Sequence, residues 1–260
     1  MDIAIFIGIF FSLGMILWGQ AIEGGHWQAM IQLTAFMIVI GGCVGAVIVQ
    51  FTLPQFMEGL KMIFGMIKPP PDHSLHYIEQ IIEFSNVVRK QGLLALEKQV
   101  KDVHDPFFRK GLQLLMDGTE PRVLREILET EVAFGEEHAE LTPKMLDAFG
   151  GYAPTYGIIG AVLGLIHVME NLDDPSKIGA GIAVAFVATI YGLIFANLIC
   201  LPLGNKLKFR NKLHGISQQL LIEGIMSMAA GENPRLTEEK LSAFLSESQK
   251  KVLQAKAKKK

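Results

Sequence analysis

Charged residues are missing from four long stretches of this 260-residue chain, although Asp, Glu, Lys and Arg make up 19% of it. A run of about 20 apolar residues is long enough to cross a bilayer as a helix, and one central charge would cost about 3 kcal/mol. These absences exclude an ordinary soluble domain and predict an all-α membrane protein. Four transmembrane helices are expected, at about residues 3–22, 33–51, 148–169 and 180–203.

The usual signatures of catalysis and of metal binding are also missing. The sequence has no glycine-rich phosphate loop, no pair of histidines at helical metal-ligand spacing and no nucleophile motif. Its two cysteines, Cys43 and Cys200, lie in apolar runs, which indicates buried thiols and no disulfide framework. We therefore predict a protein that is not an enzyme and that needs no cofactor, no metal and no nucleic acid.

Carboxylates are absent from the four apolar runs. Carriers of protons or sodium generally need an Asp or Glu at membrane depth, so a partner must supply it if this chain conducts ions. The chain itself offers hydroxyl groups and the carbonyl that Pro154 leaves without a donor. Each hydroxyl can equally bond a backbone carbonyl one turn back; we favour this for the tyrosines and weigh both roles evenly for Thr189. The hydroxyls belong to Thr155, Tyr156, Thr189 and Tyr191.

The positive charge is gathered in two regions. Of the 24 Lys and Arg residues, 11 lie at 58–147 and 12 at 205–260. The positive-inside rule places both regions, and both termini, in the cytoplasm. The first apolar run lacks the basic start and cleavage site of a signal peptide, so it is expected to remain as a span. The expected domains are a hairpin at 1–57, a helical cytoplasmic domain at 58–147, a second hairpin at 148–204 and an amphipathic cytoplasmic tail at 205–260.

Small residues recur at four-residue spacing in the last two apolar runs. Gly160 and Gly164 form one such pair, and Ala188 and Gly192 another, so each helix has a face that a second helix can approach closely. Pro154 and Pro202 lack a backbone donor, and we expect each to bend its helix.

Four charged residues lie around the helix turn in the segment VVRKQGLLALEK, namely Arg89, Lys90, Glu97 and Lys98. Arg89 and Glu97 are eight residues apart, close to two helical turns, which predicts that they share one helix face. Opposite charges on an exposed face usually form a solvated surface.

The run from Tyr152 to Leu207, which begins YAPTYGIIGAVLGLIHVME and ends ANLICLPLGNKL, resembles the third and fourth spans of flagellar motor stator A subunits, the MotA/PomA family. The EGG that ends the first hairpin helix, the stretch RKQGLLALE and the tail segment EGIMSMAAGENPR are similar too. The resemblance covers about residues 1–245. It implies a pentamer of A subunits in the lipid of the bacterial inner membrane, around two B subunits (MotB/PomB type) that supply the membrane aspartate. Ion flow through the A–B interface would turn the A ring, which pushes on the rotor protein FliG.

The resemblance also assigns roles to single residues. Arg89 and Glu97 match the charged pair that engages the rotor, and Lys90 is a weaker member of that surface. Pro154 and Pro202 match the two prolines that couple ion binding to movement. Thr189 matches the threonine near the ion path.

Ala161 bears on the choice of ion. Sodium-driven members carry a threonine at this position and proton-driven members an alanine, and a missing hydroxyl removes an oxygen ligand that sodium would need. The resemblance therefore implies proton drive. Sodium is the alternative, because DDPSKIG and ATIYG are nearer to the sodium-type sequences.

Two other functions remain open at this point. An ExbB/TolQ-like energiser of outer-membrane processes would make no rotor contact, and those proteins have three spans without this N-terminal hairpin. A scaffolding membrane protein would carry no ion flux.

Overall fold

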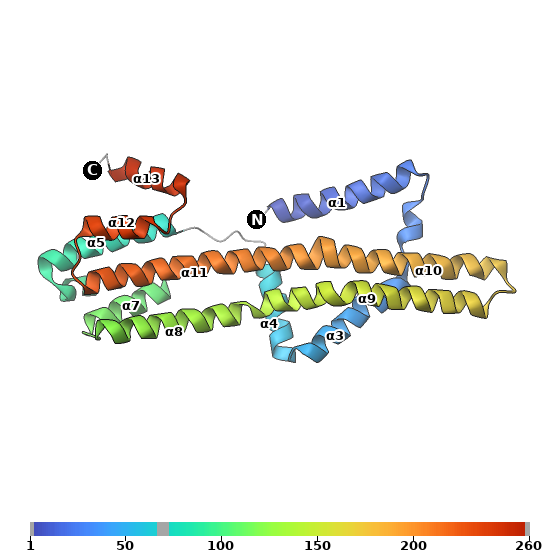
Figure 1. Cartoon of the computed structure of the whole chain (residues 1–260), viewed down its shortest axis with the longest axis horizontal. Coiled ribbons are helices and arrows are strands. Elements are labelled where there is room, and N and C mark those ends of the chain that lie inside the picture. The colour runs from blue at the N-terminus through green and yellow to red at the C-terminus, as the bar shows by residue number, and fades with distance from the viewer. Residues whose placement is uncertain (1–2, 67–72, 258–260) are drawn as a thin grey trace. The chain divides into compact units, whose positions relative to one another are not determined.

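The structure is a computed structural model that describes residues 3–66 and 73–257, and these residues form helices and turns without a strand. The prediction of an all-α fold is confirmed, and Figure 1 shows the order of the helices. The triple proline at 69–71, expected to break any helix, lies outside the described residues. Two compact units are present, which we call the membrane unit (1–69 with 139–209) and the polar unit (70–138 with 210–260). Each unit thus combines two separated segments, where we expected four successive domains.

Within residues 3–66 and 73–257, four helical stretches are long and apolar enough to cross a membrane. The first is α1 (Ile3–Ile22), and it has no buried residue. The second follows the short helix η1 (Trp27–Met30) and consists of α2 (Leu33–Phe36), the π-helical turn η2 (Met37–Gly41) and α3 (Gly42–Gln50).

The last two apolar stretches are longer than expected. The third belongs to α9 (Leu141–Glu170), which begins seven residues before the expected start of the span. The fourth consists of α10 (Pro175–Ile194), the π-helical turn η4 (Phe195–Cys200) and α11 (Leu201–Ala229). The helix therefore continues from the apolar run into the tail.

The helix α4 (Leu53–Gly65) belongs to the membrane unit, not to the domain expected at 58–147. Thr52 and Gln55 form a capping box at its N-terminus, which satisfies backbone donors that the helix itself leaves unpaired. Gly59 packs against Met145 of α9, so α4 is fixed to the third apolar helix.

The core of the polar unit draws on both of its segments. The first segment gives α5 (Ser74–Gln91), η3 (Leu93–Leu96), α6 (Glu97–Val100), α7 (Pro106–Met116) and α8 (Pro121–Ala139); the tail gives most of α11, α12 (Pro234–Ser242) and α13 (Glu247–Ala257). Fully buried side chains come from α5 to α8 and equally from α11. The residues 205–260 are therefore not a separate tail domain. The largest of these side chains are Ile78, Ile81, Phe108, Leu112, Leu124, Leu128, Leu220, Leu221, Ile222 and Ile225.

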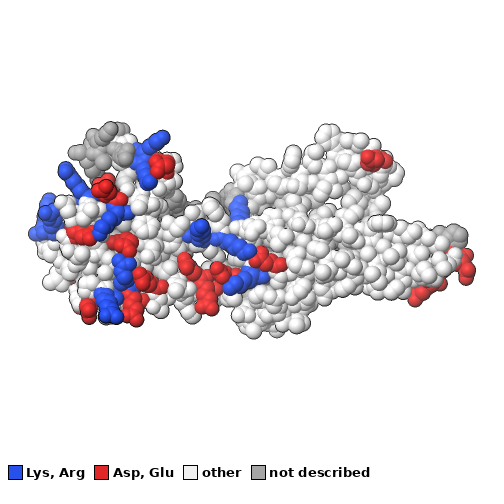
Figure 2. All heavy atoms as spheres, in the orientation of Figure 1, with Lys and Arg blue, Asp and Glu red and all other residues white. Residues whose placement is uncertain are grey.

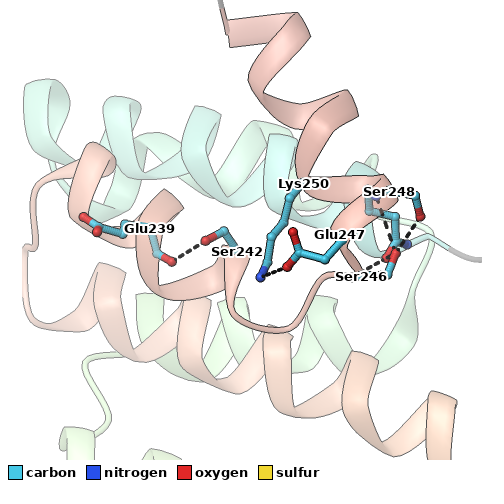
Figure 3. Close-up of polar contacts among 7 residues, drawn as sticks. Glu239, Ser242, Ser246, Glu247, Ser248 and Lys250 are labelled. Atoms are coloured by element: carbon cyan, nitrogen blue, oxygen red, sulfur yellow. Dashed lines mark hydrogen bonds and ion pairs between the residues drawn. The ribbon is translucent and has the colours of Figure 1, made fainter.

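Local hydrogen bonds set the helix starts in this unit. Asp105 accepts from the backbone N–H of Phe108 at 2.8 Å and so caps α7, and it accepts from the Tyr77 hydroxyl at 2.8 Å. Burial and this carboxylate raise the pKa of Tyr77 above its ordinary value. At the turn between α12 and α13, Ser246 and Gln249 form the cap, and Lys250 pairs with Glu247 (Figure 3).

The two units differ in their surfaces. On the face drawn in Figure 2, Lys, Arg, Asp and Glu cover much of the polar unit. The α1 helix, and the α9–α10 pair toward the turn that joins its two helices, are almost entirely white there, apart from acidic groups at the turns. Many large apolar side chains of these helices are exposed, among them Phe10 at 70%, Phe186 at 68% and Ile158 at 59%.

Candidate functional site

The backbones of α9 and α10 meet along a seam of small residues. A methyl group at Gly164 would lie 2.7 Å from the carbonyl oxygen of Gly181, and one at Gly192 would lie 2.4 Å from that of Ala153. Only hydrogen fits at these positions, so glycine lets the helices approach this closely. The close approach expected from the small-residue spacing is confirmed, and Gly160 meets Ala188 in the same seam.

The second apolar stretch covers one side of the seam and contacts α9 along it. The Tyr156 ring lies against Gly42, so near that a methyl group there would be 2.3 Å from the ring. The Tyr152 hydroxyl donates to Oε1 of Gln50 at 2.9 Å. Gly160 lies next to Ile38.

The same stretch also covers α10. The Tyr191 hydroxyl donates to the carbonyl of Met30 at 2.7 Å and accepts from the backbone N–H of Gln32 at 3.1 Å. The expectation that Tyr191 bonds a carbonyl one turn back is therefore wrong, because its hydroxyl ties α10 to the start of the second stretch. Val187 packs against this stretch as well, in a cluster with Ala35 and Val39.

Pro154, Ala161 and Thr189 lie on the opposite side of the seam. Successive residues of a helix are about 100° apart, so Pro154 and Ala161 both point about 150° away from Tyr156. By the same count Thr189 points about 160° away from both Val187 and Tyr191. All three residues are partly exposed. The structure thus brings together, on the face that the second stretch leaves open, three of the four predicted ion-path residues.

The hydroxyl hydrogen of Thr189 is already used. Its Oγ1 donates to the carbonyl of Ala185 at 3.1 Å, and Thr155 does the same toward Tyr152 at 2.7 Å. Of the two roles that we weighed evenly for Thr189, the structure contains the bond to a carbonyl one turn back, and Thr155 forms a similar bond. A hydroxyl that donates inward keeps its lone pairs for an acceptor role, so Thr189 can still offer an oxygen to the open face.

The two prolines do not break their helices. Pro154 lies within the continuous helix α9, and Pro202 is the second residue of α11. The π-helical turn η4 ends directly before α11. A proline cannot donate to the carbonyl four residues back, and a π-helical turn contains one extra residue at such an interruption. At Pro202 the helix thus changes type, from the π-helical turn η4 to α11, and the bend that we expected at each proline stays a prediction.

The two proline sites are in contact. The carbonyl that Pro154 leaves without a helical donor belongs to Gly150, four residues earlier. A methyl group at Gly150 would lie 2.5 Å from Cδ2 of Leu201, the neighbour of Pro202. Counting back four residues from the proline would have identified Gly150 in the sequence, but its contact with Leu201 follows only from the fold.

The charged turn has a different backbone from the one we predicted. Helix α5 ends at Gln91, and Gly92 has φ +82°, a conformation that L side chains rarely adopt. Arg89 and Glu97 therefore do not share one helix face, because they lie on α5 and α6 respectively. The glycine that follows a basic last turn is a typical helix stop and could have been read from the sequence.

The three predicted rotor-contact residues are all exposed. Leu96, between them in the chain, is fully buried, so the turn is held to the core of the polar unit while Arg89, Lys90 and Glu97 remain on the surface. None of the three forms an ion pair within residues 3–66 and 73–257. Glu97 also borders a surface groove of about 380 Å³, which it shares with Val100, Lys101, Arg109, Gln113 and Met116.

Comparison with known proteins identifies the family. A family model described as the MotA/TolQ/ExbB proton channel family matches residues 99–222, and one described as the N-terminal part of motility protein A matches residues 6–92. Chemotaxis protein PomA of Vibrio alginolyticus is 31% identical over 250 residues, which are 96% of this chain and 98% of that protein. The chain belongs to the MotA/PomA family.

Other MotA relatives agree along the whole length. Motility protein A of Cereibacter sphaeroides is 33% identical over 96% of this chain and 97% of its own. Among solved structures, MotAB of C. jejuni has a TM-score of 0.90 at 32% identity and covers 95% of this chain and 97% of its own. The MotAB stator complex of Bacillus subtilis has a TM-score of 0.86 at 30% identity, over 94% and 96%. The predicted resemblance is confirmed, and these relatives favour the stator over the ExbB/TolQ-like energiser.

Proposed function

We propose that this chain is the A subunit of a flagellar stator that couples ion flow to torque on the rotor protein FliG. The observation that carries the proposal is the open face of the α9–α10 seam. It combines Pro154, Ala161 and Thr189 with a complete absence of carboxylates in residues 148–169 and 178–204. A face that carries a proline, an alanine methyl group and a threonine hydroxyl, but no carboxylate, fits a partner span that brings one.

The partner in this proposal is a B subunit whose span supplies an aspartate. The relatives of known structure from C. jejuni and Bacillus subtilis are MotAB assemblies, which supports such a partner for this chain. The large exposed apolar side chains of α1, α9 and α10 support a ring of copies, which we propose to be a pentamer in the lipid bilayer. One unit charge that crosses 100 mV releases about 2.3 kcal/mol, so many ions must pass in succession for useful work.

Transmission to the rotor follows the helices that continue out of the apolar region. Helix α11 begins one residue before Pro202 and extends to Ala229, and it contributes Leu221 and Ile225 to the core of the polar unit. A shift at the Gly150–Leu201 contact would therefore move a helix that is part of the unit carrying Arg89, Lys90 and Glu97. We propose that these three exposed residues contact FliG.

The ion is proposed to be a proton, and the membrane the bacterial inner membrane. Ala161 supports the proton, since a methyl group offers no oxygen ligand for sodium. The concentration of Lys and Arg at 58–147 and 205–260 supports cytoplasmic termini and a cytoplasmic polar unit. Nothing in this scheme requires a chemical reaction on the protein or a bound cofactor.

The proposal is tested by rotation of tethered cells. A flagellated host without stators would express this chain with its cognate B subunit, and rotation would be followed with sodium present and then removed at constant proton-motive force. Rotation in both media is expected. Rotation that stops without sodium would keep the stator and change the ion, whereas no rotation with both proteins in the membrane would count against the stator.

Two hydroxyl deletions on opposite faces of α10 form a matched pair in the same assay. Thr189→Val removes an oxygen from the open face, and we expect it to slow rotation at least tenfold. Tyr191→Phe removes a hydroxyl that binds the second apolar stretch, so it should reduce thermal stability but leave the rotation of assembled complexes within about twofold.

The charged residues of the polar unit separate the stator from the energiser. Reversal of the charges of Arg89 and Glu97 should abolish the rotation that a stator drives. The activity of an ExbB/TolQ-like energiser would not change, because it makes no rotor contact.

A further inference from the structure

One polar side chain in the fourth apolar stretch has no role in the sites described so far. Asn197 lies in η4, in a segment from Ile178 to Gly204 without any charged residue, and its side chain is exposed. It is seven residues from Gly204, about 10 Å along a helix, which puts it well inside the apolar run.

The orientation of the Asn197 amide follows from its hydrogen bond. Nδ2 donates to the carbonyl of Leu193 at 3.0 Å. The opposite orientation would put Oδ1 against that carbonyl, two acceptors in contact, so the amide orientation is set by chemistry. Oδ1 is therefore directed to the exposed side, and no described residue donates a hydrogen bond to it.

Lipid is a poor neighbour for this group. Moving an amide from water into hydrocarbon without hydrogen bonds costs roughly 4–8 kcal/mol on the cyclohexane scale. The single bond to Leu193 leaves the oxygen and one N–H of Asn197 unsatisfied, so much of that cost would remain if the residue faced acyl chains. Water or a polar protein group in the assembled complex would remove it.

The helix geometry places Asn197 on the proposed ion path. Thr189, Leu193 and Asn197 succeed one another at intervals of four, which keeps them on one side of the helix. Pro202 follows Asn197 by five residues, one more than the four of a regular helical turn. The chain between them runs through the π-helical turn, which accommodates one residue more per turn. Asn197 thus lies between Thr189 and Pro202 on the side of α10 and η4 away from the second stretch.

We propose that Asn197 is a further ion-path residue, whose amide oxygen accepts a hydrogen bond from water that carries the proton, or coordinates a hydrated monovalent cation, between Thr189 and the cytoplasmic mouth. This proposal rests on the stator function proposed above. It assigns an oxygen ligand to the inner half of a path where the chain provides no carboxylate. Contact with a neighbouring subunit is the competing role, and the test separates the two.

Two substitutions distinguish the amide oxygen from the volume of the side chain. Asn197→Ser keeps an oxygen acceptor in a smaller side chain, and Asn197→Leu keeps the volume without any polar atom. Ile159→Ala is the control, because it shortens an exposed apolar side chain on α9 that points about 160° away from Ala161. Each full-length variant would be expressed with its B subunit in the stator-less host, and both rotation and co-purification with the B subunit would be measured.

The expected result is that all variants co-purify, that Asn197→Ser and Ile159→Ala rotate within about threefold of wild type, and that Asn197→Leu is at least tenfold slower. Wild-type rotation in Asn197→Leu would show that the amide faces lipid and would overturn the proposal. An equal loss in Asn197→Ser and Asn197→Leu, or loss of the B subunit from Asn197→Leu, would show a packing contact and would also overturn it. A wild-type complex that drives no rotation would count against the stator function itself, and the Asn197 proposal would fall with it.

Discussion

At the scale of single residues, missing side-chain atoms determine how closely the helices of the membrane unit pack and which groups they expose. The seam between α9 and α10 exists because Gly157, Gly160 and Gly164 bring no β-carbon to it. Beside the seam, the methyl group of Ala161 replaces the hydroxyl that sodium-driven relatives are expected to carry. The three glycines thus control packing, and we propose that Ala161 controls which ion finds a ligand.

The first prediction concerns Gly164. A methyl group there would lie 2.7 Å from Gly181 O and 2.8 Å from Ala185 N, and neither backbone atom can rotate away. Gly164→Ala should therefore destabilise the membrane unit by about 1–3 kcal/mol. Gly151→Ala is the matched control, since an added methyl group meets nothing within 4 Å, and it should be neutral or stabilising by up to about 1 kcal/mol. Thermal unfolding of the detergent-solubilised complexes would measure both; equal melting temperatures would show that the helices can separate freely.

The second prediction concerns Ala161. Ala161→Thr adds an oxygen to the open face that also carries Thr189, without adding a charge, so rotation should become dependent on sodium, with at least a threefold loss of speed when sodium is removed. Ala161→Val has a similar shape and no oxygen, and it should show no such dependence. Rotation of Ala161→Thr that ignores sodium would mean that ion choice is set elsewhere in the path.

At the scale of elements, helix ends and changes of helix type position the functional residues. Gly92 ends α5 with φ +82°, and this turn separates Arg89 from Glu97, while the buried Leu96 anchors η3 to the core of the polar unit. The π-helical turn η4, which contains Asn197, ends directly before α11 and changes the phase of the fourth stretch at Pro202. Both features, the helix end at Gly92 and the change of helix type before Pro202, occur at a residue that interrupts a regular helix.

The third prediction tests the turn at Gly92. Alanine at positive φ is strained by about 1–2 kcal/mol, so Gly92→Ala should lower the stability of the polar unit by that amount and slow rotation by displacing Glu97. Gly135→Ala lies in the helix interior of α8 with nothing within 4 Å of an added methyl group, and it should stabilise by up to about 1 kcal/mol. Hydrogen exchange at residues 93–100 would follow the local change; unchanged protection would show that the turn tolerates alanine.

At the scale of the whole molecule, distant segments depend on each other within each unit. Ile225 of α11 reaches across the polar-unit core to α7, where a methyl group at Gly111 would lie 2.4 Å from its Cδ1. Neither half of this unit has a complete core of its own, so the segment before the second hairpin and the tail are expected to fold together.

The fourth prediction uses this contact. Gly111→Ala alone should destabilise the unit by about 1–3 kcal/mol through overpacking, and Ile225→Val alone should cost about 0.5–1.5 kcal/mol. In the double variant the missing Cδ1 makes room for the methyl group, so the combined loss should be at least about 0.5 kcal/mol smaller than the sum. Denaturant unfolding of the four proteins would measure the coupling; strict additivity would mean that the two residues do not meet.

The sequence by itself determined the class of protein, and it predicted site residues whose roles stay proposals. Charge-free runs of spanning length, the spacing of small residues and the position of the prolines are local properties, and hydrophobicity acts on each run independently of the rest. The family resemblance, which needs only the order of residues, added the stator assignment.

Only the tertiary structure decided which faces of the helices are open. That Tyr191 binds the second stretch while Thr189 is turned away from it depends on which helix packs against which. The same holds for the contact of Gly150 with Leu201 and for the joint core of residues 73–138 and 210–257. Such contacts join residues far apart in the chain, and no periodicity in one segment specifies its partner in another.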